Sequence, residues 1–342
     1  MEYSYFDFQG VEEVLREIFP KEKIVFSELV MKITEGENIW ETLWDYFVTQ
    51  ISYEFQSARG NMVQLLLIVL VAAVFHNFAE IFQNKQVSEL GFYVLYMLFI
   101  SICLGTFRVL LDSVSAGVSN LLSFFKALGP IYFMGVAITT GNVTSIAFYN
   151  IMLFVIYLTE VLVTNILLPL VQTFFILRIL NEMSKEEYLS KFGDLIQMMV
   201  KWILRILMAA VVGMNVVQGM LSPAIDAVKR SALLRGGEAI PFIGDAVGGA
   251  AELMLGTVVL IRNGIGIAGV VICIAICLVP IVQMAGIVIL YKLAAAMVEP
   301  ISEKRMVNCI GNMADGASLL LQIIITICVL FLIVIAIVAS ST

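Results

Sequence analysis

Ionisable side chains are scarce in this sequence, and only one of its 342 residues is a histidine. Charged residues make up 14% of the chain, against about 25% in an average soluble protein. The sequence contains no GxxxxGK[ST], GxSxG or HExxH motif, so it offers no P-loop for ATP, no nucleophile elbow and no zincin site. We therefore expect a protein that is not an enzyme, with no catalytic residues, no cofactor and no metal site.

A cluster of basic residues, which nucleic-acid binding requires, is also missing. The net charge is −7. Residues 1–57 hold twelve acidic and four basic side chains, whereas residues 58–342 hold fifteen acidic and sixteen basic ones. An acidic segment thus precedes a nearly neutral body, and we expect no nucleic acid among the partners.

Cysteine is rare and follows no spacing typical of metal or redox sites. The chain has five cysteines, and none of them forms a CxxC motif. They are Cys103, Cys273, Cys277, Cys309 and Cys328. Since four of the five lie in apolar stretches, we interpret these residues as small, polarizable packing groups.

A cleavable signal peptide is not apparent at Met1. The first ten residues, MEYSYFDFQG, are acidic and aromatic and lack the basic and apolar regions of such a peptide. We expect the first long apolar run, near Met62, to direct the chain to the membrane.

Apolar side chains, in contrast, are abundant: they form 61% of the sequence, against about 45–50% in soluble domains. Six apolar segments have the ~20 residues that a helix needs to cross the ~30 Å hydrocarbon core. They are residues 62–82, 90–111, 146–177, 202–221, 264–291 and 317–338. The sequence therefore predicts an all-α, polytopic membrane protein with about six transmembrane helices, in contact with membrane lipid.

Two further apolar segments, 117–138 and 237–258, are interrupted by glycine and proline. Each could form a re-entrant hairpin, a broken helix or a full crossing. Backbone breaks at membrane depth are tolerated only where protein or water satisfies the freed polar groups. Pro169 and Pro280 lie inside the long third and fifth segments, and we expect each proline to bend its helix.

The prolines also indicate an internal repeat. Pro130 and Pro169 are 39 residues apart, and so are Pro241 and Pro280, with an offset of 111 between the pairs. We interpret this as a tandem duplication. Paired broken segments in two halves of a membrane protein point to a site or pore where the halves meet.

The chain accordingly divides into four parts. They are an acidic, amphipathic helical segment (1–57), two membrane helices (58–116), repeat unit one (117–221) and repeat unit two (231–342). In the first part, Val11, Leu15 and Phe19 fall on one helical face, and a later aromatic stripe beginning at Trp40 is expected at the membrane interface.

Polar and helix-bending residues in and around the repeats are the candidate pore or packing residues. They are Glu160, Pro130, Gly135, Pro169, Gln172, Pro241, Asp245, Glu252, Pro280 and Gln283. Glu160 is the clearest, because an unpartnered carboxylate within a membrane span is costly. We expect it to face the protein interior, toward the second unit or a neighbouring subunit, and to pair with a cation or line a polar path.

Several long stretches resemble one family. They are ALGPIYFMGVAITTGN (127–142), LLPLVQ (167–172), KFGDLIQMMVKWILRI (191–206), GGEAIPFIGDAVGGAAELMLGTVVLIRNGIGIAG (236–269) and EPISEKRMVNCIGNMADGASLLL (299–321). In order and extent they are similar to the stage III sporulation protein AE family of endospore-forming Firmicutes. Members of that family usually begin with a signal-peptide-like segment, which this chain does not show.

The resemblance implies a multi-pass protein of the mother-cell membrane around the forespore. It would act in a secretion-like channel, or feeding tube, with other stage III A sporulation proteins and, across the intermembrane space, with stage II sporulation protein Q. The alternatives are a secondary permease with its site between the two repeats, and a scaffold with no conduit. Assembly into a homo-oligomer stays open.

Overall fold

The computed structural model describes residues 6–19, 24–36, 48, 63, 85–140, 142–183, 189–237, 244–300 and 304–340. Within these ranges all regular secondary structure is helical, which confirms the all-α prediction. Among the described residues, five helices are long and apolar enough to cross a membrane. The predicted first span, 62–82, and the Trp40 stripe lie outside the described residues.

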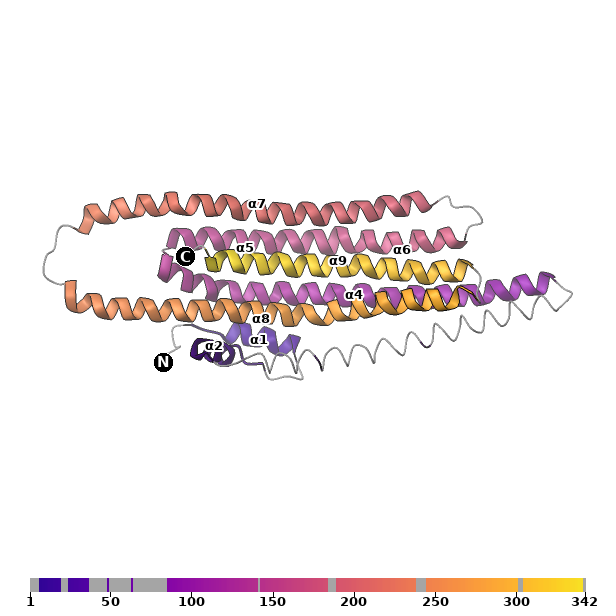
Figure 1. The fold of residues 1–342 in the computed structure, drawn as a ribbon, viewed down its shortest axis with the longest axis horizontal. Helices are drawn as coiled ribbons and strands as arrows, with labels where there is room; N and C mark the ends of the chain where they lie inside the picture. The colour runs from indigo at the N-terminus through magenta and orange to yellow at the C-terminus, as the bar shows by residue number, and fades with distance from the viewer. Residues whose placement is uncertain are drawn as a thin grey trace.

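Long helices lie side by side in an elongated bundle (Figure 1). The elements are α1 (Gln9–Ile18), α2 (Phe26–Glu35), α4 (Lys85–Thr140), α5 (Asn142–Leu162), the π-helical turn η1 (Val163–Leu167), α6 (Leu168–Met183), α7 (Ser190–Gly237), α8 (Gly244–Val298) and α9 (Lys304–Ser340). Helices α5, η1 and α6 follow one another without a gap and form one rod.

Helix α9 is the centre of the bundle. It contacts α4, α6, α7 and α8, while α4 also packs along α5 and α8. Side chains such as Met313, Leu320 and Phe331 on α9 are fully buried. The two short helices add to one side, where α1 packs on α4 and α2 on α8.

Of the three forms considered for 117–138, the re-entrant hairpin and the broken helix are wrong, because this segment continues the helix that begins before it. Residues 90–111 and 117–138 both belong to α4, and Pro130 lies inside that helix with its ring exposed. An exposed proline costs the helix one hydrogen bond, but its ring points away from the packed side. The two expected elements are therefore one rod.

The second interrupted segment lies partly in α8, which runs without a break from Gly244, and Pro241 lies outside the described residues. Helix α4 ends at Thr140 and α5 begins at Asn142, yet the positions 111 residues later, 251 and 253, lie inside α8. The helix boundaries of the two proposed units thus differ. The duplication stays a prediction.

The bundle is longer than a bilayer is thick. The rod from Asn142 to Met183 has 42 residues, so at ~1.5 Å per residue it is about 63 Å long. The hydrocarbon core is ~30 Å thick. Even with tilt, part of the bundle therefore extends beyond the hydrocarbon.

Two glycines allow close contacts between the long helices. A Cβ on Gly117 of α4 would lie 2.9 Å from the Pro280 ring carbon of α8, and a Cβ on Gly316 of α9 would lie 2.6 Å from the Phe107 ring. The Phe107 ring is itself stacked on Phe175 at 3.9 Å between centroids. Small residues thus permit the close approach of helices that membrane bundles use.

Both N-terminal helices bury apolar side chains in the bundle, including Val11 and Leu15 of the predicted face. Val11 and Leu15 of α1 and Phe26 and Val30 of α2 are buried. Phe26 lies edge-on to Phe124 of α4. The described part of the acidic segment is therefore docked on the membrane bundle and shares its core.

Candidate functional site

Helix α4 carries a row of exposed polar side chains near the middle of the bundle. They are Arg108, Asp112, Ser119, Ser123 and Lys126. The steps of four, seven, four and three residues place them on one helical face. This row lies within a candidate membrane span, Tyr96–Ile138.

The α5–α6 rod carries a second row. Its exposed polar residues are Glu160, Thr164, Asn165, Gln172 and Thr173. The π turn η1 lies between the first and the last of them. A π turn takes up about one extra residue, or ~100° of rotation, so Gln172 returns close to the face of Glu160 instead of lying about 120° away.

The two rows lie next to each other. Lys126 Nζ is 2.9 Å from Glu160 Oε2, and both side chains are 49% exposed. The helices run antiparallel, with Phe107 stacked on Phe175 and Phe133 against Tyr149. This register places Asp112 near the level of Gln172 and Ser119 near that of Thr164. We call the ten residues of both rows the polar strip.

Other helices expose apolar side chains at the same levels. On α8 these are Ile274 and Ile289, and on α9 they are Ile325 and Val329. The levels follow from the contacts Gly117–Pro280 and Phe125–Phe331. At mid-height the exposed side of α8 is therefore apolar, whereas α4 with α5 and α6 carries the polar strip, and α7 with α9 exposes Arg205 and Gln322.

Glu160 faces neither the interior of the chain nor the second unit, contrary to the expectation, because its side chain is 49% exposed. It pairs with Lys126 of α4 on the bundle surface, so the expected cationic partner is present. A neighbouring subunit stays the other expected contact.

The remaining predicted residues lie in three settings. Gln172 belongs to the polar strip, and Pro169 and Pro130 are exposed beside it. Gly135 is buried against the side chain of Arg262. Asp245 and Glu252 belong to the N-terminal part of α8.

Pro280 and Gln283 lie where α8 meets α4. Pro280 packs on Gly117, and Gln283 Oε1 accepts a hydrogen bond from the Ser113 hydroxyl. Both residues therefore take part in the contact between α8 and α4.

Polar contacts also join the helices at the end of α6. The Glu182 carboxylate accepts hydrogen bonds from Asn308 Nδ2 at 2.9 Å and Asn312 Nδ2 at 3.5 Å, which links α6 to α9. Arg178 Nη2 donates to Asp194 Oδ1 at 2.7 Å and links α6 to α7. These pairs fix the end of α6, which carries part of the strip.

A groove of about 610 Å³ lies between α7 and α9. Its lining residues are Lys201, Leu204, Arg205, Met208, Gln322, Ile325 and Thr326. The cationic side chains of Lys201 and Arg205, one helical turn apart on α7, lie across the groove from the Gln322 amide and the Thr326 hydroxyl of α9. Such a lining suits an anionic group.

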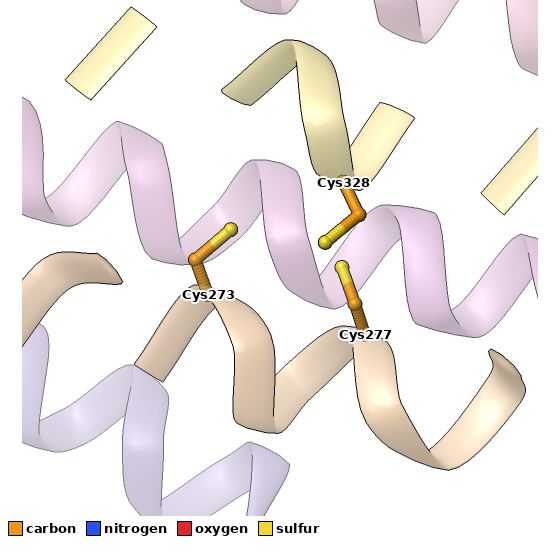
Figure 2. A group of neighbouring side chains, drawn as sticks. All are labelled: Cys273, Cys277 and Cys328. Carbon is orange, nitrogen blue, oxygen red and sulfur yellow. The ribbon is translucent and has the colours of Figure 1, made fainter. Parts of the chain in front are cut away.

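Three cysteines converge inside the bundle (Figure 2). Cys273 and Cys277 of α8 and Cys328 of α9 are buried, and their sulfur atoms all lie within 4.8 Å of one another. Cys103 and Cys309 form a separate contact between α4 and α9. Sequence spacing could not reveal the triad, because Cys328 is 51 residues from Cys277.

The α4 row of the strip was also missed from sequence, although its three- and four-residue steps were visible. The sequence pattern predicts 90–111 and 117–138 as two separate segments, and this separation divides the face between two elements. Because α4 is a single helix, its polar face is continuous from Arg108 to Lys126.

Comparisons with known proteins identify relatives. Residues 24–342 match the family model described as stage III sporulation protein AE. Stage III sporulation protein AE of Bacillus subtilis (strain 168) is 26% identical over 263 residues, which cover 76% of this chain and 66% of that protein. The alignment thus spans slightly less than two thirds of that relative. No solved structure matches.

Proposed function

Because the chain belongs to the stage III sporulation protein AE family, we propose that it is a membrane subunit of a channel complex between the mother cell and the forespore. At the coarser level it is a sporulation-related protein with several membrane-length helices. In the proposal it lies in the mother-cell membrane around the forespore. Its partners there are other stage III A sporulation proteins and, across the intermembrane space, stage II sporulation protein Q.

The polar strip is the observation that carries this proposal. Arg108, Asp112, Lys126 and Glu160 are exposed within membrane-length helices. A charge at the bilayer centre costs about 2.5–3.5 kcal/mol on insertion scales, so this side is unsuited to lipid. In a ring of subunits the strip would line the conduit, while Ile274 and Ile289 would face lipid.

The strip also suits a conduit chemically. It presents two cations, two carboxylates and several hydroxyl and amide groups. A lining of mixed charge and small hydroxyls holds water without binding one kind of ion tightly, which favours passage over retention. A scaffold protein would not need such a polar surface, because an apolar contact face would be enough to hold its partners.

The groove between α7 and α9 favours a second candidate function. It joins repeat unit one (Lys201, Arg205) to repeat unit two (Gln322, Thr326), which is where a permease of this chain would hold its solute. The paired cations indicate an anionic small molecule. In that case transport would depend on Lys201 and Arg205 and not on the strip.

Substitutions on the two sides of the bundle test the proposal. In sporulating cells, Ser119→Leu combined with Ser123→Leu would replace two strip hydroxyls, and Ile289→Val on the apolar side is the matched control. We expect normal membrane levels for both proteins, a severe loss of spores for the strip variant only, and copurification of stage III A proteins with both.

The channel proposal fails if the strip variant sporulates normally. If Lys201→Gln combined with Arg205→Gln abolishes sporulation while the strip variant does not, the permease is the better account. Copurification is read by mass spectrometry after affinity capture from sporulating cells.

A further inference from the structure

The cysteine triad of α8 and α9 has the features of a binding site for a soft monovalent metal ion. Three sulfur atoms from two helices point into one small space (Figure 2). All three residues are buried, and their sulfur atoms lie within 4.8 Å of one another. Thiol ligands select soft ions such as Cu(I). We propose that this triad binds one Cu(I) ion.

The geometry fits three-coordinate binding. With a metal–sulfur distance of ~2.3 Å, three sulfurs in a plane around the ion are about 4.0 Å apart. The observed separations need to shorten by less than 1 Å. Rotation of the Cys328 or Cys277 side chain about its Cα–Cβ bond can shorten these distances. The two residues lie on different helices, so neither helix has to move.

The coordination number separates Cu(I) from zinc. Structural zinc sites have four ligands in tetrahedral geometry. The group contains Cys273, Cys277 and Cys328 and no fourth histidine, cysteine or carboxylate among the residues that the structure describes. Three sulfur donors without a fourth ligand suit Cu(I), because this ion accepts a coordination number below four.

The surroundings determine the charge of the site. The neighbouring α9 residues Ile324, Ile327 and Phe331 are buried and apolar, and an unbalanced charge in such surroundings is expensive. The empty triad therefore holds three neutral thiols. A cysteine binds a metal ion as the thiolate, so Cu(I) binding to three sulfurs releases three protons to solvent, and no electron is transferred. We therefore expect three protons released for each ion bound, and weaker binding at lower pH.

The test uses the purified full-length chain in detergent under reducing, oxygen-free conditions. Cu(I) is offered in competition with a coloured Cu(I) chelator, and proton release is followed in weak buffer. We expect one high-affinity Cu(I) and three released protons per chain, and three sulfur neighbours of copper by X-ray absorption.

Cysteine variants locate the site. Cys328→Ser should weaken Cu(I) binding at least 100-fold, whereas Cys103→Ser combined with Cys309→Ser should leave it unchanged, because that pair lies apart from the triad. If Cys328→Ser does not fold, Cys273→Ser serves in its place, and the copper absorption measurement on the unchanged chain needs no variant.

Several results would overturn the assignment. They are no binding above the chelator, equal binding after loss of Cys328, binding that depends on Cys103 and Cys309, or a copper ion with only two sulfur neighbours. Rapid loss of two of the five thiols in air without copper, through a Cys328 disulfide, would assign the triad to redox chemistry instead.

Discussion

The ion pair between Lys126 and Glu160 gives the sharpest energetic test of where the polar strip lies. Each side chain is 49% exposed and the charged atoms are 2.9 Å apart. In water, Coulomb attraction at this distance is about 1.4 kcal/mol. Screening and lost side-chain entropy reduce exposed pairs to about 0.2–1 kcal/mol. If lipid or another dry surface covered the pair, removing one partner would cost about 3–5 kcal/mol.

A double-mutant cycle separates these cases. The proteins are the unchanged chain, Lys126→Gln, Glu160→Gln and the double variant, each heated in membranes from sporulating cells before solubilisation and immunoblotting. For a water-lined strip we expect each single variant to lower the melting midpoint by at most ~2–4 °C, as about 1 kcal/mol does in a chain of 150–250 residues. Added salt should shrink the coupling. Single-variant shifts near 10 °C that the double variant abolishes, unchanged by salt, would refute the reasoning.

Three further predictions concern packing. Gly316→Ala should destabilise the bundle by about 1–3 kcal/mol, because its Cβ would lie 2.6 Å from the Phe107 ring; Gly311→Ala on the same helix, with open space around its Cβ, should be neutral or stabilising in the same thermal assay. Glu182→Ala should lower the melting midpoint, since it removes the hydrogen bonds that join α6 to α9; an unchanged midpoint would contradict that role. Phe26→Ala should cost about 3–5 kcal/mol and expose the N-terminal helices to limited proteolysis, with normal protection as the contrary result.

The sequence predicted the fold class and the family but not how its segments join. Apolar segments of about 20 residues are sufficient to indicate membrane helices, and the family match confirms the resemblance. Glycine and proline, however, were interpreted as breaks. In α4 the Pro130 ring is exposed. The ring of Pro280 fills the space beside Gly117, where a larger residue would have its side chain. Packing between helices decides whether such residues interrupt a helix.

The candidate site was predictable only in part, for a related reason. Glu160 and Gln172 were identified as polar residues inside spans, because such residues are unusual there. Their neighbours Ser119 and Ser123 are unremarkable singly and gain meaning only from the register of α4 against α5 and α6. The cysteine triad likewise depends on the contact of α8 with α9, which spacing along one helix cannot reveal.

Solvent accessibility of the strip tests the central claim most directly. Single cysteines would replace Ser119 or Ser123 on the strip and Ile274 or Ile289 on the apolar side, and sporulating cells would be treated with a small, charged thiol reagent. The five native cysteines are buried, so the unchanged chain serves as the blank. We expect rapid labelling at both strip positions and none at the two isoleucine positions. Labelling of the isoleucine positions with protection of both serine positions would contradict a conduit along this side of the bundle.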